Sequence, residues 1–322
     1  MNKCKIVIAV PLEQRHLDYL AEKASDGNYT CEFVDVTKLD PAGAEAAAAV
    51  ADADVIIGNL PLPRVQKAAH LKWMQLNSAG ANPYADPGSL PSAVQLTNAS
   101  GTYGLTVSEH MIALTFALIR HIGPYRIQQE QHLWKKIDRN ISVEGSTIAV
   151  LGMGDIGTDY ARKVKAMGAY VIGVRKHLKD KPEYFDEQFT VDDLDRVLPR
   201  ADIVAMVLPG AADTAHLLDE RRLRLMKPGS YLLNVGRGSA IDPAGLKAVL
   251  AEGLLGGVGL DVTEPEPLPP NDSLWDDPAV LITPHAAGGF SLPETRERFV
   301  RVAGENLYAF THNGSLKNLV EH

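Results

Sequence analysis

The sequence is poor in cysteine, in basic residues and in long apolar runs. It has 2 cysteines among 322 residues. These are Cys4 and Cys31, and neither stands in a C-x-x-C pair or beside a histidine cluster. A disulfide framework and a zinc site are therefore not expected. We predict two reduced, buried thiols and no metal site.

The deficit of basic residues limits the possible partners. Lys and Arg number 32 against 40 Asp and Glu, which gives a formal net charge of −8 at pH 7. Such a surface repels nucleic acid and anionic lipid, so neither is expected as a partner. The longest apolar stretch, Met111–Ile119, is too short to span a membrane. The apolar run Ile6–Val10 is too short for a signal peptide, and we expect a cytoplasmic protein.

The sequence does contain two blocks in which strand-like and helix-like segments alternate. A chain of 322 residues, 45% hydrophobic and 22% charged, suggests about two folded domains. Alternating segments favour parallel sheets with helices on both faces. The expected strands are 5–10, 31–36, 55–59, 71–77, 94–98, 148–152, 171–175, 202–209, 231–236, 256–262 and 280–285, and the expected helices are 13–25, 42–51, 156–167, 192–198, 219–225, 243–252 and 293–308.

A long apolar helix is predicted between the two blocks. It covers Thr106–His121, and Gly123-Pro124 is expected to end it. Its composition favours a buried position at a domain or subunit interface. The last predicted helix, 293–308, would return the chain to the first block, so one domain is inserted into the other.

A glycine fingerprint follows the first strand of the second block. Gly152, Gly154 and Gly157 form G-x-G-x-x-G, with Asp155 and Ile156 between them, and a helical pattern comes next. The first glycine allows a tight turn, the second a close approach of a pyrophosphate, and the third close helix–strand packing. This context predicts a dinucleotide-binding site, with the phosphates at the helix N-terminus.

The end of the next strand bears on the choice of cofactor. A site for NAD(H) usually has an acidic residue there, which binds the ribose 2′-hydroxyl. This sequence has Arg175 and Lys176 instead. A guanidinium can bind a 2′-phosphate through two hydrogen bonds, so we predict a preference for NADP(H), with NAD(H) still possible. The alternative is a solvated basic turn that binds the cofactor loosely.

Three further segments at strand ends carry residues suited to chemistry. Arg237 follows the strand at 231–233, Glu266 follows the strand at 257–260, and His285 follows the strand at 280–282. Ligands of open α/β sheets bind beyond the carboxyl ends of the strands, so these side chains can converge. Histidine titrates near neutral pH and suits a proton donor, while an arginine can polarise a carbonyl group. Glu266 would orient the imidazole.

The same segments resemble the D-isomer-specific 2-hydroxyacid dehydrogenase family. The matching motifs are GMGDIG, ADIVAMVLPGAADT, MKPGSYLLNVGRGSAID, DVTEPEPLP and TPHAAGG, in this order. The resemblance implies that Arg237, Glu266 and His285 are catalytic. It also favours Glu266 over the neighbouring Glu264 as the partner of His285.

Further site residues are implied by the same resemblance. Small residues after a strand of the first block are expected to bind the substrate carboxylate through their backbone N–H groups. The cofactor contacts lie at the strand ends of the second block. The expected substrate-binding residues are Ala79, Gly80, Ala81 and Arg237, and the expected further cofactor contacts are Leu208, Pro209, Thr214, Val235, Gly236 and Asp261.

The resemblance also implies a fold, a reaction and an assembly. We predict an α/β protein in which a Rossmann NAD(P)-binding domain, 102–288, is inserted into a flavodoxin-like substrate domain, 1–101 plus 289–322. The expected reaction is NADPH-dependent reduction of a small 2-oxo acid, of the glyoxylate or hydroxypyruvate type, to the D-2-hydroxy acid. The expected assembly is a homodimer. The alternatives are a non-enzymatic, NAD(P)-sensing dimeric protein of the same fold and an NAD-dependent phosphoglycerate-type dehydrogenase.

Overall fold

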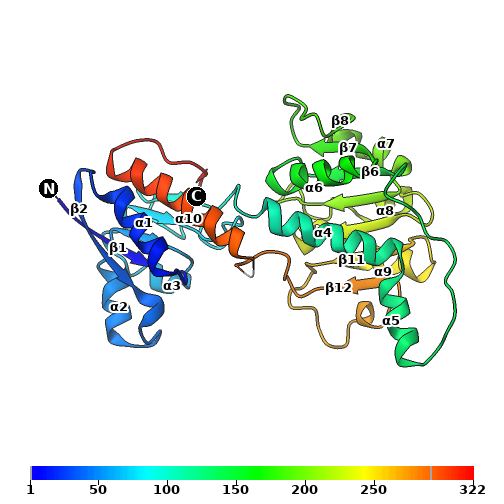
Figure 1. The fold of residues 1–322 in the computed structure, drawn as a ribbon, viewed down its shortest axis with the longest axis horizontal. Helices are drawn as coiled ribbons and strands as arrows, with labels where there is room; N and C mark the ends of the chain where they lie inside the picture. The colour runs from blue at the N-terminus through cyan, green and yellow to red at the C-terminus, as the bar shows by residue number, and fades with distance from the viewer. Residues whose placement is uncertain (1, 291) are drawn as a thin grey trace. The chain divides into compact units, whose positions relative to one another are not determined.

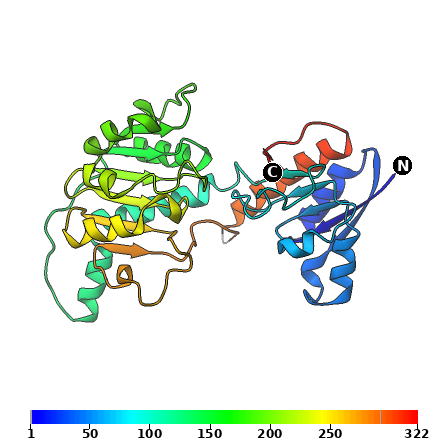
Figure 2. The ribbon, with the colours of Figure 1, turned by 180° about the vertical axis from the view of Figure 1, so that it is seen from behind.

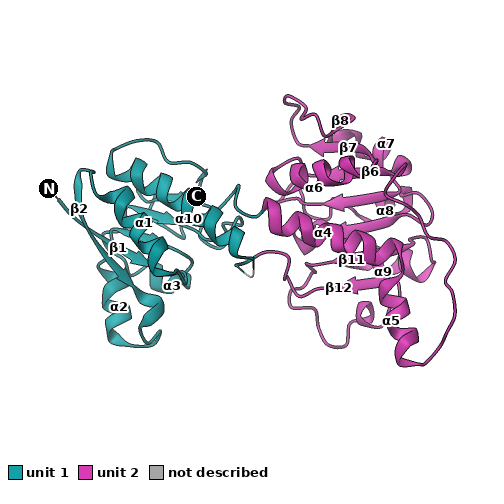
Figure 3. Cartoon of the chain, in the orientation of Figure 1, with its two compact units in different colours: residues 1–103, 289–322 teal, residues 104–288 magenta. Residues whose placement is uncertain are grey.

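The chain forms two compact units in a computed structural model that describes residues 2–290 and 292–322. Unit 1 consists of residues 1–103 and 289–322, and unit 2 of residues 104–288 (Figure 3). Unit 2 therefore lies between two segments of unit 1 in the sequence. The predicted assignment of the two parts as substrate domain and cofactor-binding domain stays a prediction at this stage.

Unit 1 is built on a six-stranded sheet (Figure 1). Its strand order is β13-β5-β4-β3-β1-β2, and every pair is parallel except β13 with β5. The five parallel strands follow the flavodoxin-like order. The strands are β1 (Asn2–Ile8), β2 (Tyr29–Asp35), β3 (Val55–Ile57), β4 (Trp73–Gln75), β5 (Gln95–Thr97) and β13 (Leu319–Val320).

Helices cover both faces of this sheet. On one face, α2 (Ala44–Ala51) and α3 (Leu62–Val65) contribute Val50 and Val65 to a core that includes Met74 of β4. On the other face lies α10 (Pro293–Thr311), whose Phe310 stacks on Trp73 with ring centroids 5.5 Å apart. Helix α1 (Gln14–Ala24) packs against α10. The C-terminal helix is thus part of the first sheet's cover.

Unit 2 is built on a seven-stranded, wholly parallel sheet. Its order is β12-β11-β10-β9-β6-β7-β8, so the first strand, β6, lies inside the sheet. Strands β7 and β8 follow on one side of β6, and β9 to β12 follow on the other side. This is the Rossmann order with one added strand, and the predicted fold class is confirmed. The strands are β6 (Thr147–Leu151), β7 (Tyr170–Arg175), β8 (Glu187–Thr190), β9 (Ile203–Met206), β10 (Tyr231–Asn234), β11 (Gly257–Leu260) and β12 (Val280–Ile282).

The central strands of unit 2 are buried on both faces, whereas the edge strands β8 and β12 are partly buried. Helices α4 (Gly104–Ile119) and α6 (Asp155–Ala166) cover one face (Figure 1). On that face, Gly259 lets Leu118 pack close to the strand. The opposite face is covered by three short helices, shown from behind in Figure 2, whose leucines share a core with Leu260. These are α7 (Leu194–Val197), α8 (Glu220–Leu225) and α9 (Pro243–Ala251).

The predicted apolar helix over 106–121 corresponds to α4, Gly104–Ile119. It packs against α6, β10 and β11 of its own unit, and its place at a domain or subunit interface stays a prediction. The Gly123-Pro124 pair does not end the helical region, because both residues lie in the first turn of α5 (Ile122–Glu130). Proline is tolerated in a first turn, where its missing N–H is not needed. No helix in the described part of the chain is long and apolar enough to cross a membrane.

Several smaller features also depart from the sequence analysis. Cys4 is buried, but Cys31 is only partly buried, so the prediction of two buried thiols is wrong for Cys31; the two are in-register neighbours on β1 and β2. Strands β8 and β13 and helices α3 and α5 were not predicted. The short 3₁₀ helices are 36–38, 191–193, 198–200, 238–240 and 273–275.

Candidate active site

The glycine fingerprint forms the turn from β6 into α6. A Cβ on Gly152 would lie 2.7 Å from the carbonyl oxygen of Val207, and one on Gly157 would lie 1.9 Å from that of Gly152. Side chains are therefore excluded at both positions. At Gly154, by contrast, no described residue other than its chain neighbours comes within 4 Å of the position a Cβ would take. Open space before a helix N-terminus fits the pyrophosphate of a dinucleotide.

Asp155 has a contact that the sequence does not reveal. Its Oδ2 accepts a hydrogen bond of 2.7 Å from the N–H of Gly104, the first residue of α4. The carboxylate therefore links the start of α4 to the start of α6. Asp155 and Ile156, both expected to contact a dinucleotide, are the first two residues of α6.

The adenosine side of the expected site is formed by the ends of β7 and β9. Arg175 is the last residue of β7 and has no carboxylate partner within the described residues. Lys176 follows it, and its Nζ lies 2.5 Å from Oδ2 of Asp213, in the loop after β9. In the same loop, Thr214 donates its hydroxyl hydrogen to the carbonyl of Pro209 at 2.8 Å, and Leu208 packs into the unit 2 core.

The loop after β10 holds Arg237 at the carboxyl end of this central strand. The buried Asn234 accepts a hydrogen bond from Gly236 N and donates one to the carbonyl of Arg237, at 3.0 and 2.9 Å. Gly236 lies against the backbone of Leu208, where a Cβ would be 2.5 Å from its carbonyl oxygen. Val235 and Gly236 are buried beside that loop. The Arg237 side chain is half-buried, and no carboxylate in the described chain pairs with it.

His285 and Glu266 meet at the carboxyl ends of β12 and β11. The Nδ1 of His285 lies 2.6 Å from Oε1 of Glu266, and both side chains are about half exposed. No hydrogen bond among the described residues uses Nε2 of His285. This arrangement leaves one ring nitrogen directed away from the carboxylate and accessible to a ligand.

The backbone at His285 is held in an unusual conformation by Asp261. His285 has a φ of 50°, in the left-handed region that few residues other than glycine adopt. Its N–H donates to the carbonyl of Asp261 at 2.8 Å, and the Asp261 side chain accepts hydrogen bonds from Ala286 N and Ala287 N. Asp261 is buried, and the hydrogen bonds that it accepts hold the turn that carries the imidazole.

A further histidine completes this arrangement and was missed from the sequence. His110, on α4, has its Nε2 3.0 Å from Oγ1 of Thr283, which in turn donates to Asp261 Oδ1 at 2.6 Å. The signal in the sequence is weak: a histidine next to Glu109 in a largely apolar helix. Such a position is consistent with many structural roles.

Glu264, the other acidic residue of the DVTEPEPLP segment, has a different partner. Its Oε2 lies 3.0 Å from Nε2 of His216, a residue of the loop after β9. The backbone N–H of His216 also donates to Ser239, two residues after Arg237, at 2.7 Å. His216 thus connects the segments that carry Arg237 and Glu266.

In unit 1, the loop 77–81 follows β4 and is held by amide side chains. Asn59 and Asn77 each accept a hydrogen bond from the other's backbone N–H, at 3.0 and 2.7 Å. Asn98 donates to the carbonyl of Ala79 at 2.9 Å. The N–H groups of Ala79, Gly80 and Ala81 take part in none of the hydrogen bonds of the described residues. Three adjacent N–H donors of this kind suit an anionic group.

Comparison with known proteins places these residues in a family context. Residues 112–287 match the family model described as "D-isomer specific 2-hydroxyacid dehydrogenase, NAD binding domain". The chain is 30% identical over 283 residues to glyoxylate/hydroxypyruvate reductase B of Pectobacterium carotovorum subsp. carotovorum. The aligned region covers 85% of this chain and 87% of that protein.

Solved structures agree over almost the whole chain. A D-isomer specific 2-hydroxyacid dehydrogenase family protein from Aeromonas salmonicida has a TM-score of 0.82 and 30% identity, and covers 99% of both chains. An NADPH-dependent glyoxylate/hydroxypyruvate reductase from Sinorhizobium meliloti, in complex with NADP and sulfate, has a TM-score of 0.80 and 26% identity, and covers 98% of both chains.

Proposed function

The chain belongs to the D-isomer specific 2-hydroxyacid dehydrogenase family, whose members are NAD(P)-dependent oxidoreductases, and on that premise we propose that it reduces a small 2-oxo acid with NADPH. The proposed substrate is of the glyoxylate or hydroxypyruvate type, and the product is the D-2-hydroxy acid. The observation that carries this proposal is the 2.6 Å contact between His285 and Glu266, on the sheet edge that also carries Arg237.

His285 is the proposed proton donor. Glu266 accepts the Nδ1 hydrogen and fixes the ring, so that Nε2 faces the substrate oxygen. When bound, the reduced nicotinamide supplies the hydride. As charge develops on the carbonyl oxygen, the imidazolium donates its Nε2 proton, and Glu266 stabilises the imidazolium before that transfer.

Arg237 is the proposed binding group for the substrate's oxygens. It is half-buried, carries no carboxylate partner in the described chain, and has N–H groups beyond the one that donates to Gly236 O at 2.7 Å. A guanidinium in this state can pair with the substrate carboxylate and polarise the carbonyl. In unit 1, the N–H groups of Ala79, Gly80 and Ala81 suit an anionic group, and we propose that they bind a substrate carboxylate.

The proposed preference for NADP(H) rests on Arg175 and Lys176. Both are cationic, and they stand at the end of β7 where an NAD(H) site usually has a carboxylate. A 2′-phosphate is bound well by such a pair. The Sinorhizobium meliloti protein, named as NADPH-dependent, supports the same preference at 26% identity.

The experiment that tests the function is a spectrophotometric screen. NADPH and NADH oxidation are followed with glyoxylate, hydroxypyruvate, pyruvate and 3-phosphohydroxypyruvate. We expect the highest kcat/KM with NADPH and one of the first two acids. Preference for NADH with the phosphorylated acid would instead favour the phosphoglycerate-type alternative. Failure to turn over any 2-oxo acid would favour the cofactor-sensing alternative.

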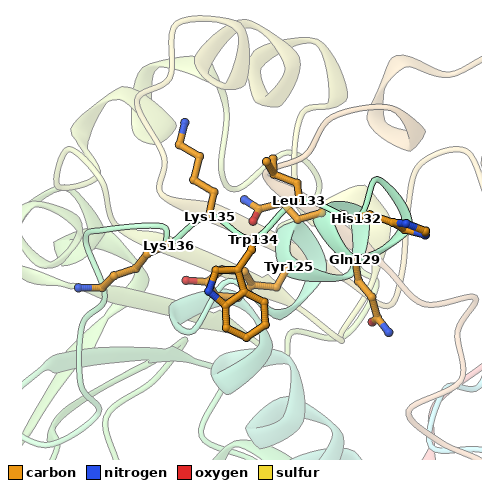
Figure 4. A pocket seen from close by; sticks show the side chains of 8 residues that line it. Tyr125, Gln129, His132, Leu133, Trp134, Lys135 and Lys136 are labelled. Carbon is orange, nitrogen blue, oxygen red and sulfur yellow. The ribbon is translucent and has the colours of Figure 1, made fainter.

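The proposed homodimer rests on exposed apolar residues around α5. Ile122, Ile127, Leu133 and Trp134 are 56%, 45%, 47% and 103% exposed. Leu133 and Trp134 line a hollow of about 700 Å³ (Figure 4). Large exposed apolar patches commonly mark protein interfaces. We expect Trp134→Ala to shift the mass measured by light scattering toward the monomer, while Trp275→Ala, at another exposed tryptophan, leaves it unchanged. A dimer that persists unchanged in Trp134→Ala would contradict this assignment.

A further inference from the structure

The expected binding site for the adenosine contains an ion pair between a cation and an anion from different loops. Lys176 follows β7, and Asp213 lies in the loop after β9. These two strands flank β6 on either side, and β6 leads into the glycine fingerprint. The ion pair, with 2.5 Å between Nζ and Oδ2, therefore bridges the carboxyl end of β6.

This position matters because the carboxyl end of β6 is the switch point of the sheet. In a Rossmann fold the dinucleotide lies across that point, with its adenosine beside the end of the second strand, here β7. Lys176 is one of the two cations that our proposed function assigns to the 2′-phosphate. Asp213 therefore holds a group that the phosphate must also use.

Asp213 is ionised under ordinary conditions. The hydrogen bond from Lys176 and its positive charge lower the pKa of the Asp213 carboxyl below its usual value. A 2′-phosphate carries close to two negative charges at neutral pH, and the carboxylate would repel it at short range. NAD(H) has no such phosphate and meets neither the repulsion nor the competition.

We propose that Asp213 is a specificity-determining residue that weakens NADP(H) binding by competing with the 2′-phosphate for Lys176. This inference rests on the proposed function, because it assumes that Lys176 binds that phosphate. NAD(H) binds with the Lys176–Asp213 pair in place. NADP(H) binds only when Lys176 turns from the carboxylate to the phosphate. Asp213 thus narrows the difference in affinity between the two cofactors.

The test measures cofactor binding by titration calorimetry in Asp213→Asn, Lys176→Met and a control, Glu305→Gln. Glu305 also pairs with an exposed lysine, Lys317 at 2.9 Å, but belongs to unit 1, so Glu305→Gln makes the same change in net charge outside the unit that carries the fingerprint. At low salt, we expect Asp213→Asn to lower the Kd for NADPH about three- to tenfold, from the Coulomb repulsion removed at a few ångströms. The Kd for NADH should stay within about twofold, and salt should reduce the gain.

The same comparison with adenosine 2′,5′-bisphosphate and AMP isolates the phosphate. The gain in Asp213→Asn should appear with the bisphosphate and be absent with AMP. An unchanged or higher Kd for NADPH in Asp213→Asn, or an equal gain for NADH, overturns the role of Asp213. If Lys176→Met weakens NADPH binding while Asp213→Asn has no effect, only this inference fails. If Lys176→Met changes nothing and the wild type binds NADH as tightly as NADPH, the proposed cofactor preference fails as well.

Discussion

The carboxyl ends of β3, β4 and β5 in unit 1 differ from the strand ends of unit 2 in the kind of polar side chain they carry. In unit 2, the loops beyond β7, β9, β11 and β12 carry titratable side chains joined in pairs across loops, such as His285 with Glu266 and His216 with Glu264. In unit 1, the segments 58–60, 76–81 and 98–100, beyond β3, β4 and β5, contain no ionisable side chain. Their polar contacts come from amides, such as those of Asn59 and Asn77.

On the proposed function, this difference corresponds to a division of tasks between two mostly parallel sheets. Charged pairs beyond the strands of unit 2 can hold and move protons. Neutral amides in unit 1 fix a loop while leaving its backbone N–H groups available, and they add no charge that would repel or attract a ligand. If the comparison is right, removing a titratable group from unit 2 abolishes chemistry, and adding one to unit 1 impairs substrate binding.

The largest effect is expected from His285→Ala. Loss of the proposed proton donor should lower kcat by about 10²- to 10⁴-fold, which is the usual contribution of general acid catalysis. NADPH binding, measured by calorimetry, should persist, because His285 stands beyond the strands that carry the fingerprint. His70→Ala, at an exposed histidine of unit 1, is the control and should leave kcat unchanged. A kcat of His285→Ala within tenfold of the wild type would rule out the assigned role.

A smaller effect is expected from Asn77→Asp, which adds a charge to the neutral edge of unit 1. The carboxylate can still accept the hydrogen bond from Asn59 N, so the loop should keep its shape. It would, however, repel a substrate carboxylate, and we expect the KM for the 2-oxo acid to rise about thirty- to hundredfold.

Asn77→Ala separates the charge from the lost hydrogen bond. It should raise the KM for the 2-oxo acid less than Asn77→Asp does, and neither variant should change the Kd for NADPH. If the two variants raise the KM equally, the neutrality of this edge has no functional importance. The loop would then matter only for its shape.

The parts of the site that follow from local sequence were predictable. Gly152 and Gly157 are required by the backbone of a single turn, and Arg237, Glu266 and His285 each follow a buried strand. Parallel strands end at a common edge, so their side chains could be expected to converge. The side-chain pairs could not be predicted in the same way, because each joins two loops that are distant in the sequence. These pairs are Lys176 with Asp213 and His216 with Glu264.

The elements that the sequence did not reveal lack the usual local signals of their type. Strand β8 has the sequence Glu187-Gln188-Phe189-Thr190, without the apolar run of a central strand, and it lies at the edge of the sheet beside β7. Strand β13 has two residues and pairs only with β5. Helix α5 contains Gly123-Pro124, which normally indicates the end of a helix. For β8 and β13, contacts within the sheet outweigh local preference. In α5, Gly123-Pro124 lies in the first turn, where proline is tolerated, so the pair indicates a helix start here and not a helix end.

The smallest effect is expected from Tyr103→Phe, which tests how firmly unit 1 holds its neutral loop. The buried Tyr103 hydroxyl donates a hydrogen bond to the carbonyl of Asn77, and burial raises the pKa of Tyr103 to about 12. The variant should lose about 1 kcal/mol of unfolding free energy, since that carbonyl loses its partner. A raised folded pKa means that the tyrosine's contribution is complete below about pH 10, its ordinary pKa, and is lost as the pH rises toward 12. Urea unfolding at several pH values should therefore show a constant difference in unfolding free energy between wild type and variant up to about pH 10 and a smaller difference above it.

The control is the exposed Tyr308→Phe, which should show neither the loss of unfolding free energy nor the pH dependence. A Tyr103→Phe variant as stable as the wild type at neutral pH would mean that the loop is held by its amides alone.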